Sequence, residues 1–130
     1  MNVLFICNGN VARSQIAEAL WNWHFGKTIG MASSAGVNPN YELADQFKVV
    51  MKELGVPIDG HRSKHVNEFD LNDFEWIVTF SNEADEYVKA HNVSANHCHY
   101  DVSDPGWNGT IEQYRYTRDV IDMIVTGEWQ

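Results

Sequence analysis

The chain has 130 residues, of which 44% are hydrophobic and 21% are charged, and we expect one soluble globular domain over residues 1–130. Eighteen acidic residues against nine lysines and arginines give a formal net charge of −9, so no basic stripe is available for a nucleic-acid backbone, and anionic lipid would repel the surface. No run approaches the roughly 18 apolar residues of a membrane span, and the short N-terminal apolar run has no basic leader. We therefore expect a cytoplasmic protein, a monomer or weak dimer, without nucleic-acid or membrane partners.

Apolar runs of strand length alternate along the chain with stretches of helical periodicity. The expected strands cover residues 3–7, 31–35, 76–80 and 96–102, and the expected helices cover residues 14–25, 43–54, 83–91 and 111–125. Ser81 or Asn82 is expected to cap the third helix, and the polar residues 60–73 are expected to form a loop with one helical turn. Strands that alternate with helices pair in parallel through right-handed crossovers. The pattern thus predicts a three-layer α/β/α sandwich around a four-stranded parallel sheet.

Three of these helices have an apolar side. In the helix over residues 14–25, the side chains at helical spacing are Ile16, Ala17, Leu20, Trp23 and His24. In the helix over residues 43–54 they are Leu43, Phe47, Val50, Met51 and Leu54. In the last helix they are Ile111, Tyr114, Val120, Ile121, Ile124 and Val125.

Cys7 ends the first expected strand and stands six residues before Arg13. A strand that runs through a glycine-containing loop into a helix directs several backbone N–H groups at one point, where the helix dipole favours an anion. Arg13 could place its planar guanidinium on two oxygens of a tetrahedral oxyanion. Cys7 would then lie beneath the central atom, and the surrounding positive field would favour its thiolate. The candidate phosphate-binding residues are Asn8, Gly9, Asn10, Val11, Ala12, Arg13 and Ser14.

A purely structural interpretation stands beside this one. Cys7 is then a half-buried cysteine at a strand end, and Arg13 is a surface residue in the first turn of a helix. Two cysteines, Cys7 and Cys98, do not make a disulfide framework. The run His97-Cys98-His99 suggests a metal site, but successive strand residues point to opposite faces, so three in a row rarely close a tetrahedron. We expect no metal and no cofactor.

Beyond this loop, several motifs extend over nearly the whole chain. They are "VLFICNGNVARSQIAEAL" at residues 3–20, "SSAG" at 33–36, "VMKELGVPIDGHRSKHV" at 50–66, "WIVTFSNEAD" at 76–85, and Asp104-Pro105 followed by "EQYRYTRDVI". Their order and spacing resemble the low-molecular-weight protein tyrosine phosphatases, a family that shares its fold with the thioredoxin-coupled arsenate reductases. The resemblance implies a four-stranded parallel sheet with strand order 2-1-3-4, flanked by helices.

The resemblance also implies roles for individual residues. Cys7 would be the nucleophile that forms a phosphocysteine intermediate, and Arg13 would hold the phosphoryl oxygens. Asp104 would protonate the leaving group and then act as the base for the hydrolytic water. Without the resemblance, Asp104 before Pro105 is interpreted as a turn opener before it is interpreted as a catalytic acid.

Supporting roles follow from the same resemblance. Asn10 would shape the loop in a left-handed backbone conformation, and Ser14 and Ser34 would brace the loop and stabilise the thiolate. Ser34 is otherwise an ordinary strand-end hydroxyl. Trp107 is placed to wall the site against an aromatic ring, or else it is a core aromatic.

The sequence departs from the family pattern at three places. Ala12 stands where members often carry a second cysteine that protects the nucleophile. The segment "TFSNEADEYV" has none of the further cysteines that a thioredoxin-coupled arsenate reductase needs. Gly106 follows Asp104-Pro105 where many members have an aromatic residue, with Trp107 one place later.

Three functions remain open from the sequence. The first is a phosphomonoesterase, a protein tyrosine phosphatase by resemblance, that acts on a phosphorylated protein or a small phosphomonoester through Cys7, Arg13 and Asp104. The second is an arsenate reductase that uses Cys7 with an external thiol or Cys98. The third is a non-catalytic, regulatory module that binds oxyanions.

Overall fold

The computed structural model describes residues 1–128. Its strands are β1 (Val3–Cys7), β2 (Ala32–Gly36), β3 (Trp76–Thr79) and β4 (Asn96–His99). Its helices are α1 (Arg13–Phe25), α2 (Asp45–Glu53), α3 (Asn82–Ala90) and α4 (Ile111–Glu128), and two short 3-10 turns, η1 (Val66–Glu68) and η2 (Leu71–Asp73), precede β3.

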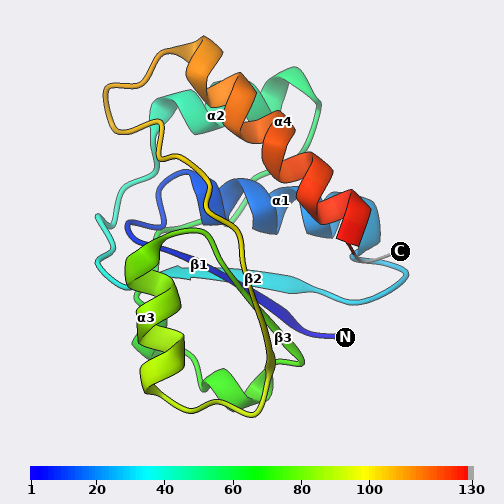
Figure 1. Ribbon diagram of the computed structural model, residues 1–130. Helices are drawn as coiled ribbons and strands as arrows, with labels where there is room; N and C mark the ends of the chain where they lie inside the picture. The colour runs from blue at the N-terminus through cyan, green and yellow to red at the C-terminus, as the bar shows by residue number, and fades with distance from the viewer. Residues whose placement is uncertain (129–130) are drawn as a thin grey trace.

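The four strands form one parallel sheet in the order β2-β1-β3-β4 (Figure 1). In the register of the sheet, Cys7 at the end of β1 pairs with Gly36 at the end of β2. The strand order and the all-parallel pairing confirm the expected fold class. They bring the carboxyl ends of β1 and β2 to one edge, where open α/β sheets form their binding crevice.

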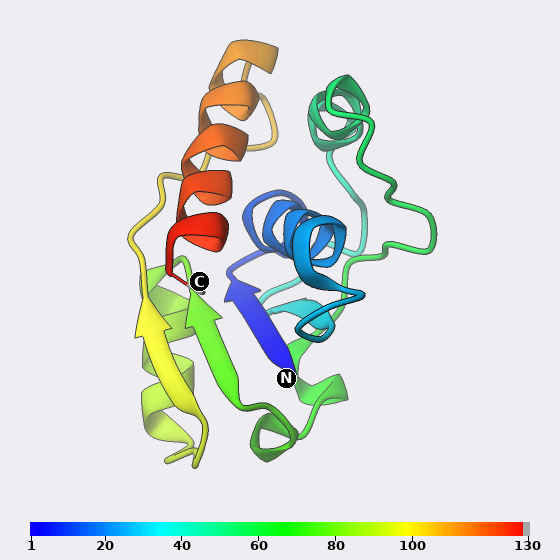
Figure 2. The same cartoon turned by 90° about the vertical axis from the view of Figure 1, so that its right-hand side faces the viewer.

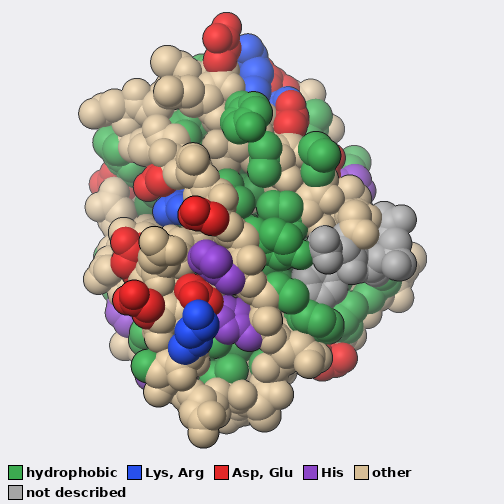
Figure 3. Space-filling view, in the orientation of Figure 1, with side chains coloured by type: hydrophobic (Ala, Val, Ile, Leu, Met, Phe, Trp, Pro, Cys, Tyr) green, Lys and Arg blue, Asp and Glu red, His purple; other side chains and the backbone are tan. Residues whose placement is uncertain are grey.

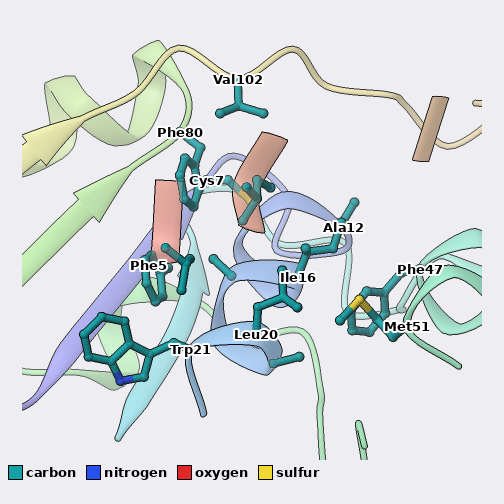
Figure 4. Close-up of a cluster of buried hydrophobic side chains, with 14 of the residues drawn as sticks. Phe5, Cys7, Ala12, Ile16, Leu20, Trp21, Phe47, Met51, Phe80 and Val102 are labelled. Carbon is teal, nitrogen blue, oxygen red and sulfur yellow. The ribbon is translucent and has the colours of Figure 1, made fainter. Parts of the chain in front are cut away.

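Helices cover both faces of the sheet (Figure 2). α1, α2 and α4 lie on one face, and α3 lies on the other. Alternation along β1 divides its side chains accordingly: Phe5 and Cys7 join the core beneath α1, whereas Leu4 and Ile6 join the core beneath α3. Figure 4 shows the larger core, in which the ring of Phe5 stacks on Phe80 with centroids 5.9 Å apart.

The buried face of α1 differs from the expected one. Trp21 is fully buried, and its Nε1–H donates to the Gly30 carbonyl at 2.9 Å. Trp23, which was assigned to the apolar face, is 54% exposed, and His24 is exposed beside Asp122. The buried stripe continues from Ala17 through Trp21, four residues on, so Trp23 and His24 fall on the outer side.

Several element boundaries also differ from those expected. β4 ends at His99 rather than at residue 102, because β3 ends at Thr79 and offers no further partner; the last bond runs from Tyr100 N–H to the Thr79 carbonyl. Residues 60–73 contain two 3-10 turns rather than one helical turn. α2 ends at Glu53, and Leu54 is exposed. Ser81 caps α3 by accepting a hydrogen bond from Ala84 N–H, as expected for one of the two candidates.

Figure 3 shows two features of this face of the molecule. A group of charged and histidine side chains lies over the α3 side, with further charged side chains at the top of the view, and a band of hydrophobic side chains runs beside α4. Among residues 1–128, no helix is both long enough and apolar enough to cross a membrane.

Candidate active site

The candidate site is built on the loop of residues 8–12 that joins β1 to α1. Four backbone N–H groups of residues 37–44, the segment between β2 and α2, donate hydrogen bonds to the carbonyls of Cys7 and of this loop. Val37, Asn38, Asn40 and Ala44 donate to the carbonyls of Cys7, Asn8, Gly9 and Val11, at 3.2, 2.8, 3.2 and 3.3 Å. Because the carbonyls are turned outward to these partners, the loop leaves its N–H groups on the inner side.

The inner side of the loop encloses a small cavity. Its volume is about 60 Å³, and it is lined by residues 7–13 and Asp104. Ala12 occupies the N-cap of α1 and supplies no side-chain acceptor to the first turn. A helix start without a side-chain cap leaves N–H donors for a bound anion. One water molecule needs about 10–15 Å³ on the same measure, so the cavity has room for one small oxyanion.

Cys7 lies buried at the floor of this loop, with two polar groups on its sulfur. The Asn10 N–H donates to Sγ at 3.2 Å, and the Ser14 hydroxyl oxygen lies 2.9 Å from Sγ. When the sulfur is a thiolate, only the Ser14 hydroxyl can donate in this second contact. Two hydrogen-bond donors are thus available to the sulfur.

Asn10 holds the loop in shape from within. Its φ of 52° lies in the left-handed region, which asparagine tolerates better than most residues. Its Nδ2 donates to the hydroxyls of Ser14 at 2.7 Å and of Ser34 at 3.0 Å. The structure thus brings together Asn10, Ser14 and Ser34, three residues that were expected to support the loop.

Arg13 is anchored by one nitrogen of its guanidinium. Nη1 donates to the carbonyls of Phe80 at 3.0 Å and Val102 at 2.9 Å, and the side chain is buried. Nη2 lies 3.6 Å from Oδ2 of Asp104. With Nη1 fixed in this way, the rest of the fork can face an oxyanion in the cavity.

Asp104 lines the same cavity as Cys7, from the loop that leads into α4. Its Oδ1 accepts the Gly106 N–H at 2.9 Å, so it does open a turn, while Oδ2 faces Arg13. The carboxylate is 55% exposed. Trp107, on the same loop, is 46% exposed and is not among the residues that line the cavity.

A buried polar network behind the loop was not foreseen. Gln15 Nε2 donates to Oδ1 of Asn10 at 2.9 Å, and its Oε1 lies 2.8 Å from His61 Nδ1. Glu18 accepts a hydrogen bond from Ser34 at 2.7 Å and lies 3.3 Å from His61 and 3.6 Å from Lys64. Burial lowers the pKa of His61 and of Lys64, and the carboxylate of Glu18 opposes both shifts.

The second cysteine lies apart from this site. Cys98 is on β4, paired with Val78 of β3, and neither cysteine is in a disulfide. β3 separates β4 from β1, so Cys98 is about 10 Å from β1 across the sheet, beyond the roughly 7 Å that a disulfide spans between Cα atoms. His97 and His99 lie together on the opposite face, at 3.0 and 2.8 Å from Thr79 Oγ1.

Comparison with known proteins places this arrangement in a family. The chain is 33% identical over 107 residues to an arsenate reductase of Brevibacillus brevis, which covers 79% of this chain and 75% of that relative. It is 28% identical over 151 residues to the low molecular weight protein-tyrosine-phosphatase YfkJ of Bacillus subtilis, with 98% and 90% covered. The crystal structure of a low molecular weight protein tyrosine phosphatase from T. tengcongensis superposes with a TM-score of 0.80 at 25% identity, covering 97% of this chain and 95% of that one.

The family model described as "Low molecular weight phosphotyrosine protein phosphatase" matches residues 2–127. This match spans every strand, the loop of residues 8–12 and the segment that carries Asp104. The chain belongs to the low molecular weight phosphotyrosine protein phosphatase family.

Proposed function

We propose that this protein is a cysteine-dependent phosphomonoesterase that acts on aryl phosphates such as phosphotyrosine. One observation carries the proposal: a nucleophile, an anion-binding loop, a guanidinium and a carboxylic acid meet on one cavity of about 60 Å³. Anion binding alone needs neither a buried cysteine nor an acid. The combination therefore favours turnover over a regulatory module that only binds oxyanions.

The first half of the reaction breaks the ester bond. The Cys7 thiolate attacks phosphorus as the bond to the leaving oxygen breaks, and the loop N–H groups and Arg13 stabilise the charge on the phosphoryl oxygens. Asp104, in its protonated form, donates its proton to the leaving oxygen. The products of this step are a free phenol and a phosphocysteine.

The second half releases phosphate. The Asp104 carboxylate takes a proton from a water molecule that attacks the phosphocysteine, in accordance with microscopic reversibility. The sulfur leaves as a thiolate, stabilised by the Asn10 N–H and the Ser14 hydroxyl. No metal or cofactor takes part in these steps.

Arsenate reduction is the second candidate, because the relative that is 33% identical is named an arsenate reductase. Cys7 would attack arsenate in the same cavity with loss of water, and an external thiol would then reduce the adduct to arsenite and form a disulfide with Cys7. Cys98 is a poor candidate for that thiol, since it lies across β3 from the site.

The deciding experiment measures two reactions with the same set of proteins. Hydrolysis of aryl phosphates and arsenate-dependent oxidation of an added thiol are followed for the wild type, Cys7→Ser and Asp104→Asn. We expect hydrolysis by the wild type, none by Cys7→Ser, and a fall of about 10²–10⁴-fold for Asp104→Asn on a poor leaving group. Arsenate turnover without aryl phosphate hydrolysis by the wild type would overturn the proposal in favour of the second candidate.

A further inference from the structure

The loop of residues 104–110, here called the acid loop, is shaped by hydrogen bonds within the loop and with α4. Inside the loop, Gly106 N–H bonds Asp104 and Gly109 N–H bonds the Gly106 carbonyl at 3.1 Å. Tyr114 of α4 donates its hydroxyl to the same Gly106 carbonyl at 2.6 Å. These contacts fix the shape of the acid loop and its junction with α4, but none of them ties it to the rest of the site.

Gln46, in the first turn of α2, supplies such a tie. Its Nε2 donates to the carbonyls of Trp107 and Gly109, both at 2.9 Å. Both protons of one amide are thus used on two carbonyls of the acid loop. Figure 1 shows the segment before α4 passing beside α2, far from α2 along the chain.

The docking of α2 itself does not depend on Gln46. At the other end of the helix, Glu53 accepts hydrogen bonds from Arg115 at 2.7 Å and Arg118 at 2.8 Å, and Arg118 also donates to the Val50 carbonyl at 3.0 Å. Phe47 is fully buried beneath the helix. Loss of the Gln46 amide would therefore release the acid loop and leave α2 packed on α4.

We propose that Gln46 is a positioning residue that holds the acid loop so that Asp104 stays over the phosphate cavity. The inference rests on the proposed function, since it concerns the acid of that reaction. The carboxylate of Asp104 is more than half exposed, its hydrogen bond with Gly106 stays within the acid loop, and its contact with Arg13 is long at 3.6 Å, so its own side chain ties the loop only weakly to the cavity. An acid that is displaced by about 1 Å loses much of its effect.

The test compares aryl phosphates whose leaving groups differ in basicity. Dinitrophenyl phosphate needs little help from an acid, whereas phenyl phosphate needs a proton on its leaving oxygen. We expect Gln46→Met to lower kcat/KM for phenyl phosphate about tenfold, a part of the 10²–10⁴-fold that general acids contribute, and that for dinitrophenyl phosphate less than about twofold. A general loss of structure would lower both equally.

Three further variants make the outcome unambiguous. Gln46→Lys restores donors to the two carbonyls and should recover most of the activity on phenyl phosphate. Lys48→Met is the matched control, because it introduces methionine on the same helix at an exposed side chain whose ion-pair partner is Asp45. It should behave like the wild type. Asp104→Asn should show the same dependence on leaving group as Gln46→Met, but a larger one.

Failure of the inference and failure of the proposed function look different in this experiment. If Asp104→Asn discriminates between the leaving groups and Gln46→Met does not, Gln46 has no positioning role and the proposed function stands. If Asp104→Asn itself does not discriminate, the acid has been assigned wrongly, and the inference about Gln46 falls with it.

Discussion

The sulfur of Cys7 lies 2.9 Å from the hydroxyl oxygen of Ser14, and Asn10 Nδ2 donates to that same oxygen at 2.7 Å. The hydroxyl of Ser14 thus accepts from Asn10 and is free to donate its proton to a thiolate. This arrangement orders the hydroxyl in advance, so in the proposed reaction it would stabilise sulfur both as the nucleophile and as the leaving group of the second step.

Ser14→Ala should therefore slow turnover without loss of the fold. A hydrogen bond to a charged group contributes about 1.5–3 kcal/mol, which corresponds to a fall in kcat of about 10- to 100-fold. Because sulfur leaves in the second step, phosphocysteine should accumulate, and rapid mixing with an aryl phosphate should show a burst of phenol. Ser33→Ala, on β2 beside Ser34, is the matched control and should keep the wild-type rate; equal rates for the two variants would contradict the assignment.

Tyr114 gives a pH-dependent prediction about stability. Burial raises its pKa above the ordinary value of 10.0, and the negative charge of Asp104 acts in the same direction. The unfolded chain therefore loses this proton at a lower pH than the folded protein does. The contribution of the Tyr114 proton to the free energy of unfolding is complete below about pH 10, and it is lost as the pH rises through the folded-state pKa.

Urea unfolding of the wild type and Tyr114→Phe measures this contribution. The free energy of unfolding should fall less in Tyr114→Phe than in the wild type between about pH 8 and about pH 11. Tyr116→Phe removes a side chain that is 71% exposed and should retain the wild-type slope. A common slope for all three proteins would show that Tyr114 does not stabilise the fold through its proton.

The order of strands and helices could be predicted because the local hydrophobic pattern of the sequence agrees with the elements that form. Strands of a parallel sheet that are buried on both faces read as continuous apolar runs, as β1 does. β4 is less apolar, and its predicted end was wrong because β3 ends at Thr79 and leaves the later residues without a neighbouring strand. The side chain of Val102 is buried in the core on the α1 side of the sheet, and its carbonyl accepts from Arg13 rather than from a strand.

From residue spacing alone, the candidate site was predicted only where its residues are contiguous, whereas Asp104 and Ser34 were named from the family resemblance. Cys7, Arg13 and the loop between them lie within seven residues, whereas His61 and Lys64 come from a polar loop with no regular pattern. Only the fold brings that loop beneath the site. One available signal was Gln15 beside Ile16 on the buried side of α1, because a polar side chain there needs a partner.

The absence of a cysteine at position 12 predicts a particular response to oxidation. Peroxide converts a reactive thiolate to a sulfenic acid and then to a sulfinic acid, which thiols do not reduce. In the wild type, dithiothreitol should restore little activity after peroxide treatment. Ala12→Cys places a thiol on the same cavity as Cys7, so a disulfide should form and dithiothreitol should restore most of the activity.

Cys98→Ser is the control for this experiment. Because Cys98 lies across β3 from the site, its removal should change neither the rate of inactivation nor the recovery. Full recovery in the wild type that disappears in Cys98→Ser would show that the two cysteines can meet, and would contradict the separation seen in the sheet.

The last prediction concerns which glycine is sterically required for the loop of residues 8–12. A Cβ atom on Gly36 would lie 2.7 Å from the Asn8 carbonyl oxygen and 3.0 Å from the backbone nitrogen of Asn10, whereas one on Gly9 would come no closer than 3.7 Å to Val11. Backbone atoms of a loop held by outward hydrogen bonds cannot move aside without cost. Gly9 lies inside the loop but has room for a side chain. The position where only glycine fits against the backbone of the loop is therefore Gly36, at the end of β2.

Gly36→Ala should lower the free energy of unfolding by about 1–3 kcal/mol, as overpacking does. It should also weaken competitive inhibition by inorganic phosphate, because the displaced backbone carries the N–H groups that are proposed to bind the anion. Gly9→Ala should change the free energy of unfolding by less than about 0.5 kcal/mol. Urea unfolding of both variants, together with their inhibition constants for phosphate, checks the comparison. A larger loss of stability in Gly9→Ala would mean that the loop, and not its support on β2, is the sterically restricted element.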